Sequence, residues 1–373
     1  GGSIVLASSS GDLTVTGGAD DDGLGVEADG AGNILLRSIN GAVDLRSDLV
    51  GDVGNVSVIG NGDVTQAAGG DIVTGGNGTI DVQAENGSLV MSDGSRSVTS
   101  GSSIRYEAAD SIALGLLDTR LRMEPSGWGD VSLIATGGDV RDAAADDNSV
   151  DVYAHRLRVE AGGDVGSMSP QNAIDTEVVT LAAVAREDSH LALHDASDVT
   201  VGQTPVGTAQ RVGTDGRTFG RSDVSGLSDL RSSSNGSIVL WTTDGSIRVN
   251  DGTSPLDGNG VVADGAGNVL LEAGGAGSTI TANAGVRSAT GNITLIADAD
   301  VTIGSAGHIA TAGSGTVDVE SRNGSINMDG GATASTAGGN IRLSAAQSVR
   351  PGGILAGPGN VSLTATHGDI VDN

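Results

Sequence analysis

The sequence contains no cysteine and no lysine, and only five of its 373 residues are aromatic: two Trp, two Tyr and one Phe. The absence of cysteine excludes disulfides and thiolate metal sites. With so few aromatic residues, a buried core must consist mainly of Val, Ile, Leu and Ala. No apolar run approaches the roughly 18 residues of a membrane-spanning helix, so we expect no membrane insertion.

The charge is strongly negative, because 47 acidic residues accompany 19 basic ones and give a formal net charge of −28. A chain with this charge repels nucleic acid, which we exclude as a partner. Cations are the small ligands that it favours. The acidic residues comprise 38 Asp and 9 Glu, and an excess of Asp is typical of turns and strand ends rather than helices.

Ten seven-residue segments recur along the chain, mostly 20 to 27 residues apart. The third place of each is Ile or Val, the fifth is Leu, Val or Tyr106, and the seventh is Ala, Ser or Gly. This alternation predicts a β-strand in each segment, with the third and fifth residues pointing inward. The segments begin at Gly32, Gly54, Gly78, Ser102, Gly129, Gly267, Gly291, Gly315, Gly339 and Gly359.

Short strands that repeat about every 24 residues, separated by Gly, Asn and Asp turns, predict a stack of coils. We expect an all-β fold, a right-handed parallel β-helix (β-solenoid) of roughly 16 coils spaced about 4.8 Å apart. Asn occupies the second place in six segments, where stacked amides would bond along the axis. Residues 173–185 are compatible with either a helix or a strand.

The coil-length repeats are themselves grouped into a longer sequence repeat. The sequence ADGAGNILL at 28–36 returns as ADGAGNVLL at 263–271, and the segments match one to one at offsets of 230 to 237 residues. We therefore divide the chain into a complete super-repeat, 1–235, and a partial one, 236–373. We expect the chain to be a segment of a longer tandem array whose neighbours are further repeats or copies of the same protein.

The fourth place of the segments points outward and repeats in the same order in both super-repeats. Asp81 precedes Arg105 by one coil, and Asp318 precedes Arg342 in the same way. We expect both pairs to form ion pairs between coils on an exposed face, each contributing about 0.2 to 1 kcal/mol. The two series are Leu35, Ser57, Asp81, Arg105, Ser132 and Leu270, Thr294, Asp318, Arg342, Ser362.

Residues 202–235 interrupt the period, and their local charge is +1 because four Arg accompany three Asp. Two interpretations remain open: an excursion that docks on an acidic neighbour in the same or another chain, or a solvated loop. Alternation also turns Trp241 outward, where we expect the excursion to cover it. The candidate partner-contact residues are Arg211, Arg217, Phe219, Arg221, Arg231 and Trp241.

Acidic turns are the candidate metal sites. Carboxylate and carbonyl oxygens there could hold calcium, the one cofactor that the sequence suggests, although solvated turns are the simpler interpretation. The candidate ligands are Asp20, Asp21, Asp22, Asp142, Asp146 and Asp147. His190 and His194 lie four residues apart, which in a strand is about 13 Å, too far to share one metal ion.

The stretch GNVSLTATHGDI at 359–370 and the Gly/Asn/Asp-rich array of coils resemble the β-helical shafts of filamentous-haemagglutinin-like adhesins, large bacterial surface exoproteins. The resemblance covers nearly the whole chain and implies an extracellular location on the bacterial cell surface. It implies a non-catalytic rod for cell-surface architecture, cell–cell joining or self-assembly.

Two other functions remain open. The first is an adhesin module that binds a specific surface glycan or protein through residues 202–235. The second is a carbohydrate-active enzyme on a β-helix, which would need a strong base or paired carboxylates beside aromatic sugar platforms. Without Lys and with few aromatic residues, we expect no enzymatic activity.

Overall fold

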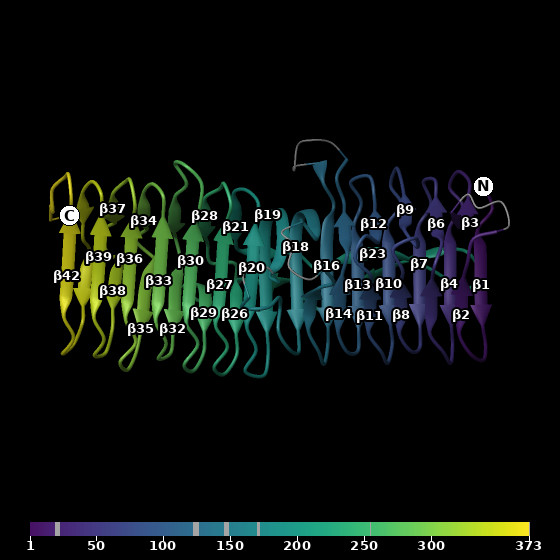
Figure 1. Ribbon diagram of the computed structural model, residues 1–373, viewed down its shortest axis with the longest axis horizontal. Helices are drawn as coiled ribbons and strands as arrows, with labels where there is room; N and C mark the ends of the chain where they lie inside the picture. The colour runs from purple at the N-terminus through teal and green to yellow at the C-terminus, as the bar shows by residue number, and fades with distance from the viewer. Residues whose placement is uncertain (19–22, 122–126, 145–148, 170–171, 254, 373) are drawn as a thin grey trace. The chain divides into compact units, whose positions relative to one another are not determined.

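The computed structural model describes residues 1–18, 23–121, 127–144, 149–169, 172–253 and 255–372. Over these residues, parallel strands stack into an all-β solenoid of about 14 turns (Figure 1). This confirms the predicted fold class. Over the same residues, the structure contains no helix long and apolar enough to span a membrane.

The chain forms two compact units. The first comprises Gly1–Val178 and Pro205–Gly226, and the second comprises Val179–Thr204 and Leu227–Asn373. The prediction of roughly 16 coils was too high, because the solenoid has about 14 turns and part of the chain lies outside the regular coils. Leu191 pairs with Ile238, 47 residues later (238 − 191), which is about twice the usual coil.

Each regular coil has three strands, and strands at the same place in successive coils pair in parallel and in register. The first side of the coils contains the seven-residue segments, and we call all its strands the segment strands. In the first unit they are β1 (Ile4–Ser8), β4 (Ile34–Ser38), β7 (Val56–Gly60), β10 (Ile80–Ala84), β13 (Ile104–Ala108), β16 (Asp130–Ala135) and β18 (Val152–Ala161). The second side contains β2 (Leu13–Val15), β5 (Val43–Leu45), β8 (Val64–Gln66), β11 (Leu89–Met91), β14 (Ile112–Leu114) and β17 (Val140–Asp142). The third contains β3 (Leu24–Ala28), β6 (Asp48–Gly51), β9 (Ile72–Thr74), β12 (Arg96–Val98) and β15 (Leu116–Asp118), which pairs with β18.

The second unit repeats this arrangement. Its segment strands are β20 (Leu191–Asp195), β27 (Ile238–Thr242), β30 (Val269–Ala273), β33 (Ile293–Ala297), β36 (Val317–Ser321), β39 (Ile341–Ala345) and β42 (Val361–Ala365). The second side contains β21 (Val199–Val201), β28 (Ile247–Val249), β31 (Ile280–Ala282), β34 (Val301–Ile303), β37 (Ile326–Met328) and β40 (Val349–Arg350). The third contains β26 (Leu230–Ser232), β29 (Asn259–Ala263), β32 (Gly285–Ser288), β35 (His308–Thr311), β38 (Thr333–Ser335) and β41 (Gly353–Leu355).

The helix-like stretch at 173–185 is a strand, β19 (Ile174–Ala185), which pairs with β21 and β26. Its alternating Val, Leu and Ala residues suit a strand because β-branched residues favour one. Four short strands are antiparallel and lie outside the coil pattern. They are the pair β22 (Gln203–Thr204) and β25 (Leu227–Ser228) and the pair β23 (Thr208–Val212) and β24 (Thr218–Ser222).

The core lies inside the coils, where the third and fifth segment residues are almost fully buried, as alternation predicts, except in the last segment, where Val361 is 48% exposed. Tyr106 is the one aromatic residue at these places, and its hydroxyl lies 2.6 Å from Ser97 Oγ and 3.1 Å from Gln66 Oε1. Burial raises the pKa of this hydroxyl well above its usual value. The hydrogen bonds therefore allow a large polar residue to replace an aliphatic one.

Asparagine at the second segment place bonds along the axis, as predicted. Asn33 Oδ1 accepts the backbone N–H of Asn55 at 2.9 Å and its side-chain amide at 3.1 Å. In the second unit, Asn268 Oδ1 accepts the backbone N–H of Asn292 at 2.8 Å. These bonds satisfy polar groups at the start of each strand and hold adjacent coils in register.

Glycine at the first segment place allows the coils to approach closely. A Cβ atom on Gly291 would overlap the carbonyl oxygen of Gly267, and one on Gly267 would overlap that of Gly236. The same overlap recurs through Gly315 and Gly339. Glycine therefore fills this place in nine of the ten segments, because a side chain there would push the backbones of adjacent coils apart; Ser102 is the exception.

We predict that Gly291→Ala lowers the free energy of unfolding of the second unit by about 1 to 3 kcal/mol, because the added methyl group overpacks the coil interface. Urea unfolding followed by Trp241 fluorescence in a Trp128→Phe background measures this. The matched control is Gly330→Ala, where a Cβ atom meets nothing within 4 Å. Equal effects of the two substitutions would contradict the close-approach explanation.

Candidate functional site

The irregular stretch of the chain contains a β-hairpin, hereafter the docked hairpin, which we define as Pro205–Gly226. Its strands β23 and β24 pair antiparallel, with Arg211 opposite Phe219. The turn closes because Gly213 N–H donates to the carbonyl of Arg217 at 2.7 Å and Gly216 adopts a φ of 75°. Glycine is favoured there because other residues rarely adopt positive φ.

The docked hairpin packs on the outward side of the segment strands of the first unit, and β23 contacts β7, β10 and β13 (Figure 1). Val212 forms an apolar cluster with Leu35 and Ile59. Its backbone N–H donates to Ser57 Oγ at 2.9 Å. The residues covered are those at the fourth segment place, which we call the first lateral face: Leu35, Ser57, Asp81, Arg105 and Ser132.

Asp223, near the end of the docked hairpin, is the centre of a buried ion-pair network. Its Oδ1 accepts from Arg105 Nε at 2.7 Å. Its Oδ2 accepts from Arg158 Nη1 at 3.1 Å and from Ser132 Oγ at 2.6 Å. The side chain of Asp223 is 0% exposed, so these two arginines supply the positive charge that a buried carboxylate requires.

Arg211 makes the reciprocal contact from the hairpin to the coils. Its Nε donates to Asp81 Oδ2 at 2.5 Å and its Nη1 donates to Gln83 Oε1 at 2.6 Å. Asp81 also accepts from Arg105 at 3.3 Å. The hairpin therefore contributes both an arginine and a carboxylate, and each binds the opposite charge on the first lateral face.

Glu107 joins the same network at its edge. It accepts from Arg105 at 2.7 Å and from Arg221 of the docked hairpin at 3.1 Å. Burial favours a higher pKa for this carboxyl, but the charges and hydrogen bonds of Arg105 and then Arg221 outweigh it, so the pKa of Glu107 is lowered.

The docked hairpin extends along the stacking axis from the first coil to the seventh coil of its unit. At its turn, the carbonyl of Gly216 accepts from Ser3 Oγ at 3.2 Å and from Asn33 Nδ2 at 3.1 Å. Near its other end, the carbonyl of Ser225 accepts from Arg158 Nη2 at 3.1 Å. Ser3 precedes β1 and Arg158 lies in β18, so one hairpin ties together all seven coils.

This coverage corrects the expectation that both Asp–Arg pairs lie on an exposed face. The side chains of Asp81 and Arg105 are 0% and 1% exposed. In the second unit, Asp318 and Arg342 are 34% and 45% exposed, and Arg342 Nε donates to Asp318 Oδ1 at 2.7 Å. The two pairs have the same register, but they have different surroundings because only the first is covered by the docked hairpin.

The other residues predicted to contact a partner lie outside the buried ion-pair network. Arg217 is 89% exposed and lies 3.9 Å from Asp215, while Phe219 is 53% exposed at the rim of a cavity of about 310 Å³ beside Val212. The ring of Trp241 stacks on that of His194 of β20, with ring centroids 5.0 Å apart and planes 13° apart. That the excursion covers Trp241 stays a prediction.

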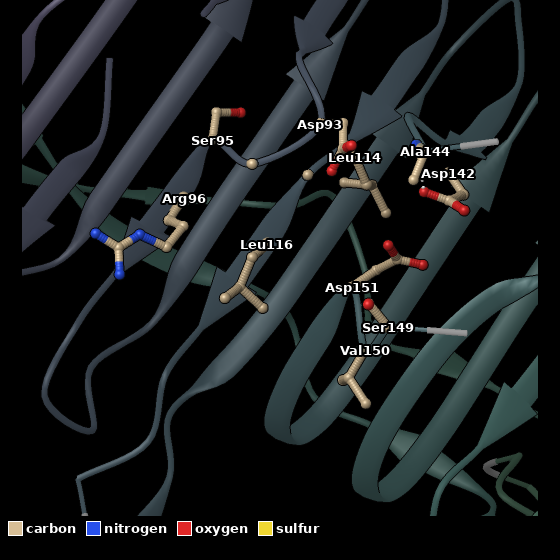
Figure 2. Close-up of a pocket in the computed structure, with 12 residues that line it drawn as sticks. Asp93, Ser95, Arg96, Leu114, Leu116, Asp142, Ala144, Ser149, Val150 and Asp151 are labelled. Carbon is tan, nitrogen blue, oxygen red and sulfur yellow. Dashed lines mark hydrogen bonds between the residues drawn. The ribbon is translucent and has the colours of Figure 1, made fainter. Parts of the chain in front are cut away.

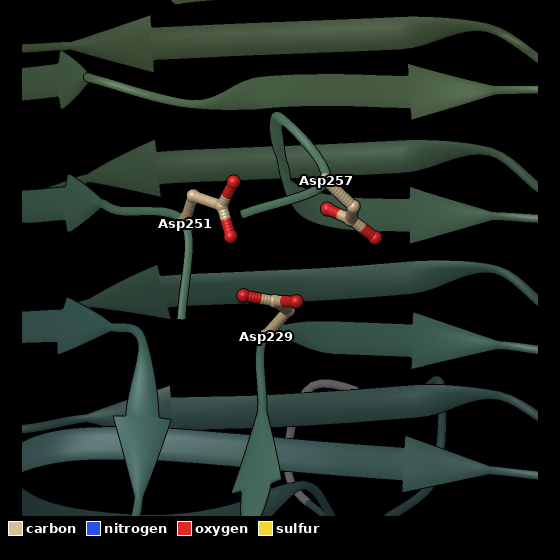
Figure 3. Close-up of side chains that lie close together, drawn as sticks. All are labelled: Asp229, Asp251 and Asp257. Carbon is tan, nitrogen blue, oxygen red and sulfur yellow. The ribbon is translucent and has the colours of Figure 1, made fainter. Parts of the chain in front are cut away.

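Three carboxylates of the second unit lie close together (Figure 3). Asp229, Asp251 and Asp257 each place one oxygen within 4.8 Å of the others. The Arg231 guanidinium donates to Asp229 at 3.2 Å and to Asp257 at 2.6 Å. Burial raises the pKa of Asp229. Arg231 thus supplies a positive charge to two of the three carboxylates.

Of the six candidate calcium ligands, Asp142 lies among the described residues, at the end of β17, and accepts the backbone N–H of Ala144 at 2.8 Å. Asp20, Asp21, Asp22, Asp146 and Asp147 lie outside the described residues. Calcium binding therefore stays a prediction.

Asp142 also lines a cavity of about 240 Å³ in the first unit (Figure 2). Asp93 and Asp151 contribute two further carboxylates, and Arg96 at its rim pairs with Asp71 at 2.6 Å. Leu114, Leu116 and Val150 form the apolar part of the lining. The cavity is small, and its lining is partly acidic and partly apolar.

The two histidines have separate partners. His190 Nδ1 accepts the backbone N–H of Ser237 at 2.9 Å, and His194 Nε2 lies 2.6 Å from Thr243 Oγ1. Each bond connects neighbouring coils of the second unit.

No family model, curated protein or solved structure matches this chain.

We predict that Asp223→Ala lowers the free energy of unfolding of the first unit by about 3 to 5 kcal/mol, because Arg105 and Arg158 would stay buried without a counter-charge. Urea unfolding followed by Trp128 fluorescence in a Trp241→Phe background isolates this unit, since Trp128 lies within it. Asp215→Ala is the control, because Asp215 is 64% exposed. A loss below about 1 kcal/mol for Asp223→Ala would show that the network does not hold the hairpin.

We also predict that acid releases the docked hairpin. The folded pKa of Glu107 lies below its unfolded value, so its contribution is present above about pH 4 and is lost as the pH falls through the folded pKa. Hydrogen exchange of the Val212 amide across this range measures the release. Because other carboxylates also titrate in acid, Glu107→Gln is the comparison, and its profile should be flatter. Identical profiles would exclude a role for Glu107.

Proposed function

We propose that this chain is a non-catalytic structural segment of a giant extracellular bacterial surface protein, in which it forms a rigid rod for cell-surface architecture or cell–cell joining. The observation that carries the proposal is the docked hairpin, which runs along the stacking axis and bonds to the first and the seventh coil of its unit. Such a contact opposes separation of the coils, and this is the property that a load-bearing shaft requires.

The repeated side chains support the same role. Between super-repeats, the features that recur are contacts from coil to coil, including the Asn33–Asn55 and Asn268–Asn292 bonds. The Asp81–Arg105 and Asp318–Arg342 pairs recur in the same register. Recurrence of axial contacts is expected where a constant stacking geometry is needed along the whole array.

The net charge and the sequence resemblance support an extracellular location. The pattern of coils resembles the shafts of filamentous-haemagglutinin-like surface proteins, which implies an extracellular position. A net charge of −28 keeps such shafts soluble and repels neighbouring ones. An adhesin function would instead need an accessible receptor site, and the structure commits Arg211 and Arg221 of the excursion to internal ion pairs.

Electron microscopy of the purified chain over a concentration series, with calcium and with chelator, tests the proposal. We expect elongated particles of constant width, because each coil adds about 4.8 Å to a stack. Compact particles would overturn it. In parallel, the chain and a variant lacking residues 205–226 are assayed for binding and cleavage on a polysaccharide panel. Cleavage, or glycan binding that the deletion abolishes, would replace the structural function with an enzymatic or receptor-binding one.

A further inference from the structure

The second unit has an uncovered surface that matches the one beneath the docked hairpin. We call it the second lateral face and define it as Leu270, Thr294, Asp318, Arg342 and Ser362. We propose that the second lateral face binds a β-hairpin that carries an arginine in the place of Arg211 and a carboxylate in the place of Asp223. The inference that this face binds a hairpin rests on the contacts within the chain, and the choice of its occupant rests on the proposed function, a segment of a longer repeat protein.

The positions on the two faces correspond through strand register. Asp81 pairs with Arg105 and Asp318 pairs with Arg342 in parallel ladders of the same order. Ser57 precedes Asp81 by one coil, and Thr294 precedes Asp318 in the same way. The geometry that receives the docked hairpin is therefore present twice.

The hydrogen-bond and apolar partners of the hairpin backbone are retained. Ser57 Oγ and Thr79 Oγ1 accept backbone N–H groups of Val212 and Gln210 at 2.9 and 2.8 Å. Hydroxyl groups occupy the corresponding places in the second unit, on Thr294 and Thr316. The apolar pair Leu35 and Ile59, which contacts Val212, corresponds to Leu270 and Ile296.

The charges are also complementary. On the first lateral face, Arg105 directs Nε to Asp223 of the hairpin and Nη1 to Asp81. On the second, Arg342 Nε donates to Asp318 at 2.7 Å and Nη2 donates to Glu320 at 2.8 Å. An incoming carboxylate can therefore take the Arg342 Nε contact, while an incoming arginine takes the carboxylates that Arg342 releases.

Arg158, the second arginine that binds Asp223, lies in β18 and has no counterpart among the described residues of the second unit. Two further differences define the preferred hairpin. Glu320 stands where the first face has Gln83, the second acceptor of Arg211, so the site for the incoming arginine is more acidic. Ser344 stands where the first face has Glu107, the partner of Arg221. The occupant therefore needs the arginine equivalent to Arg211 and does not need one equivalent to Arg221.

The occupant that we propose is a hairpin from a further super-repeat of the same kind. In a chain with one docked hairpin and two equivalent faces, moving the hairpin to the second face of another copy would uncover the first face. Exchange between copies would thus create as much exposed surface as it removes. A separate donor avoids this loss, and the Arg/Asp pattern of Pro205–Gly226 defines its chemistry.

A cyclised, fluorescent peptide of residues 205–226, added to the full-length chain, provides the test by fluorescence polarisation. We expect saturable one-to-one binding that Arg342→Ala weakens at least tenfold. Arg287→Ala is the matched control, because Arg287 is exposed in the same unit but lies in β32, on another side of the coil. The peptide with Asp223→Asn should bind more weakly to the parent chain.

A second measurement covers a peptide that does not fold. The hairpin is joined to the C-terminus through a flexible linker, and Thr294→Cys introduces a single thiol, since the chain has no cysteine. The tethered hairpin should slow thiol labelling at least tenfold, as Ser57, the equivalent residue, is 0% exposed. Unchanged labelling overturns the proposal, as does peptide binding that Arg342→Ala leaves intact. Dimerisation of the chain without peptide that Arg342→Ala abolishes would overturn the proposed occupant in favour of a second copy.

Discussion

The in-register stacking of coils is the constraint on which the other features depend. Each coil meets the next through backbone hydrogen bonds, and glycine at the first segment place allows this approach, as Gly291 shows against Gly267. Because the register of the segment strands is constant, a side chain at a given place on these strands lies beside the same place in the next coil. The asparagine bonds, the Asp–Arg pairs and the two lateral faces all follow from this one geometric condition.

The docked hairpin uses that regularity to bury charge. Arg105 is 1% exposed and contacts Asp81, Glu107 and Asp223, so its burial depends on a carboxylate supplied 118 residues later in the chain. Removing one member of such a network lowers the free energy of unfolding by more than the intact network adds to it. The reason is that the remaining buried charge has no water to solvate it. The buried charges of the first unit therefore require the hairpin to stay in one position. The exposed pair Asp318–Arg342 has no such requirement, because water can solvate it.

The sequence was sufficient to predict the strands because alternation and period are local signals, and residues such as Ile80 and Val82 are buried where the pattern placed them. It was also sufficient to predict the axial pairing of Asp81 with Arg105. It did not reveal that this pair is buried. Asp223 lies in the stretch that interrupts the coil period, so no repeat in the sequence indicates that it lies beside Arg105 and Arg158. The turn residues of the hairpin, including Gly216, were a visible signal, but turn residues do not indicate which surface a hairpin covers.

The contacts at the two ends of the docked hairpin also make it a molecular ruler. Its turn bonds to Ser3 and Asn33, and its other end bonds to Arg158, so its length is matched to a fixed number of coils. Duplication or loss of a single coil within the first unit would displace one set of contacts from the other. We therefore expect recombination that changes the length of such a protein to be tolerated in whole super-repeats, which makes the super-repeat rather than the coil the unit of evolutionary change.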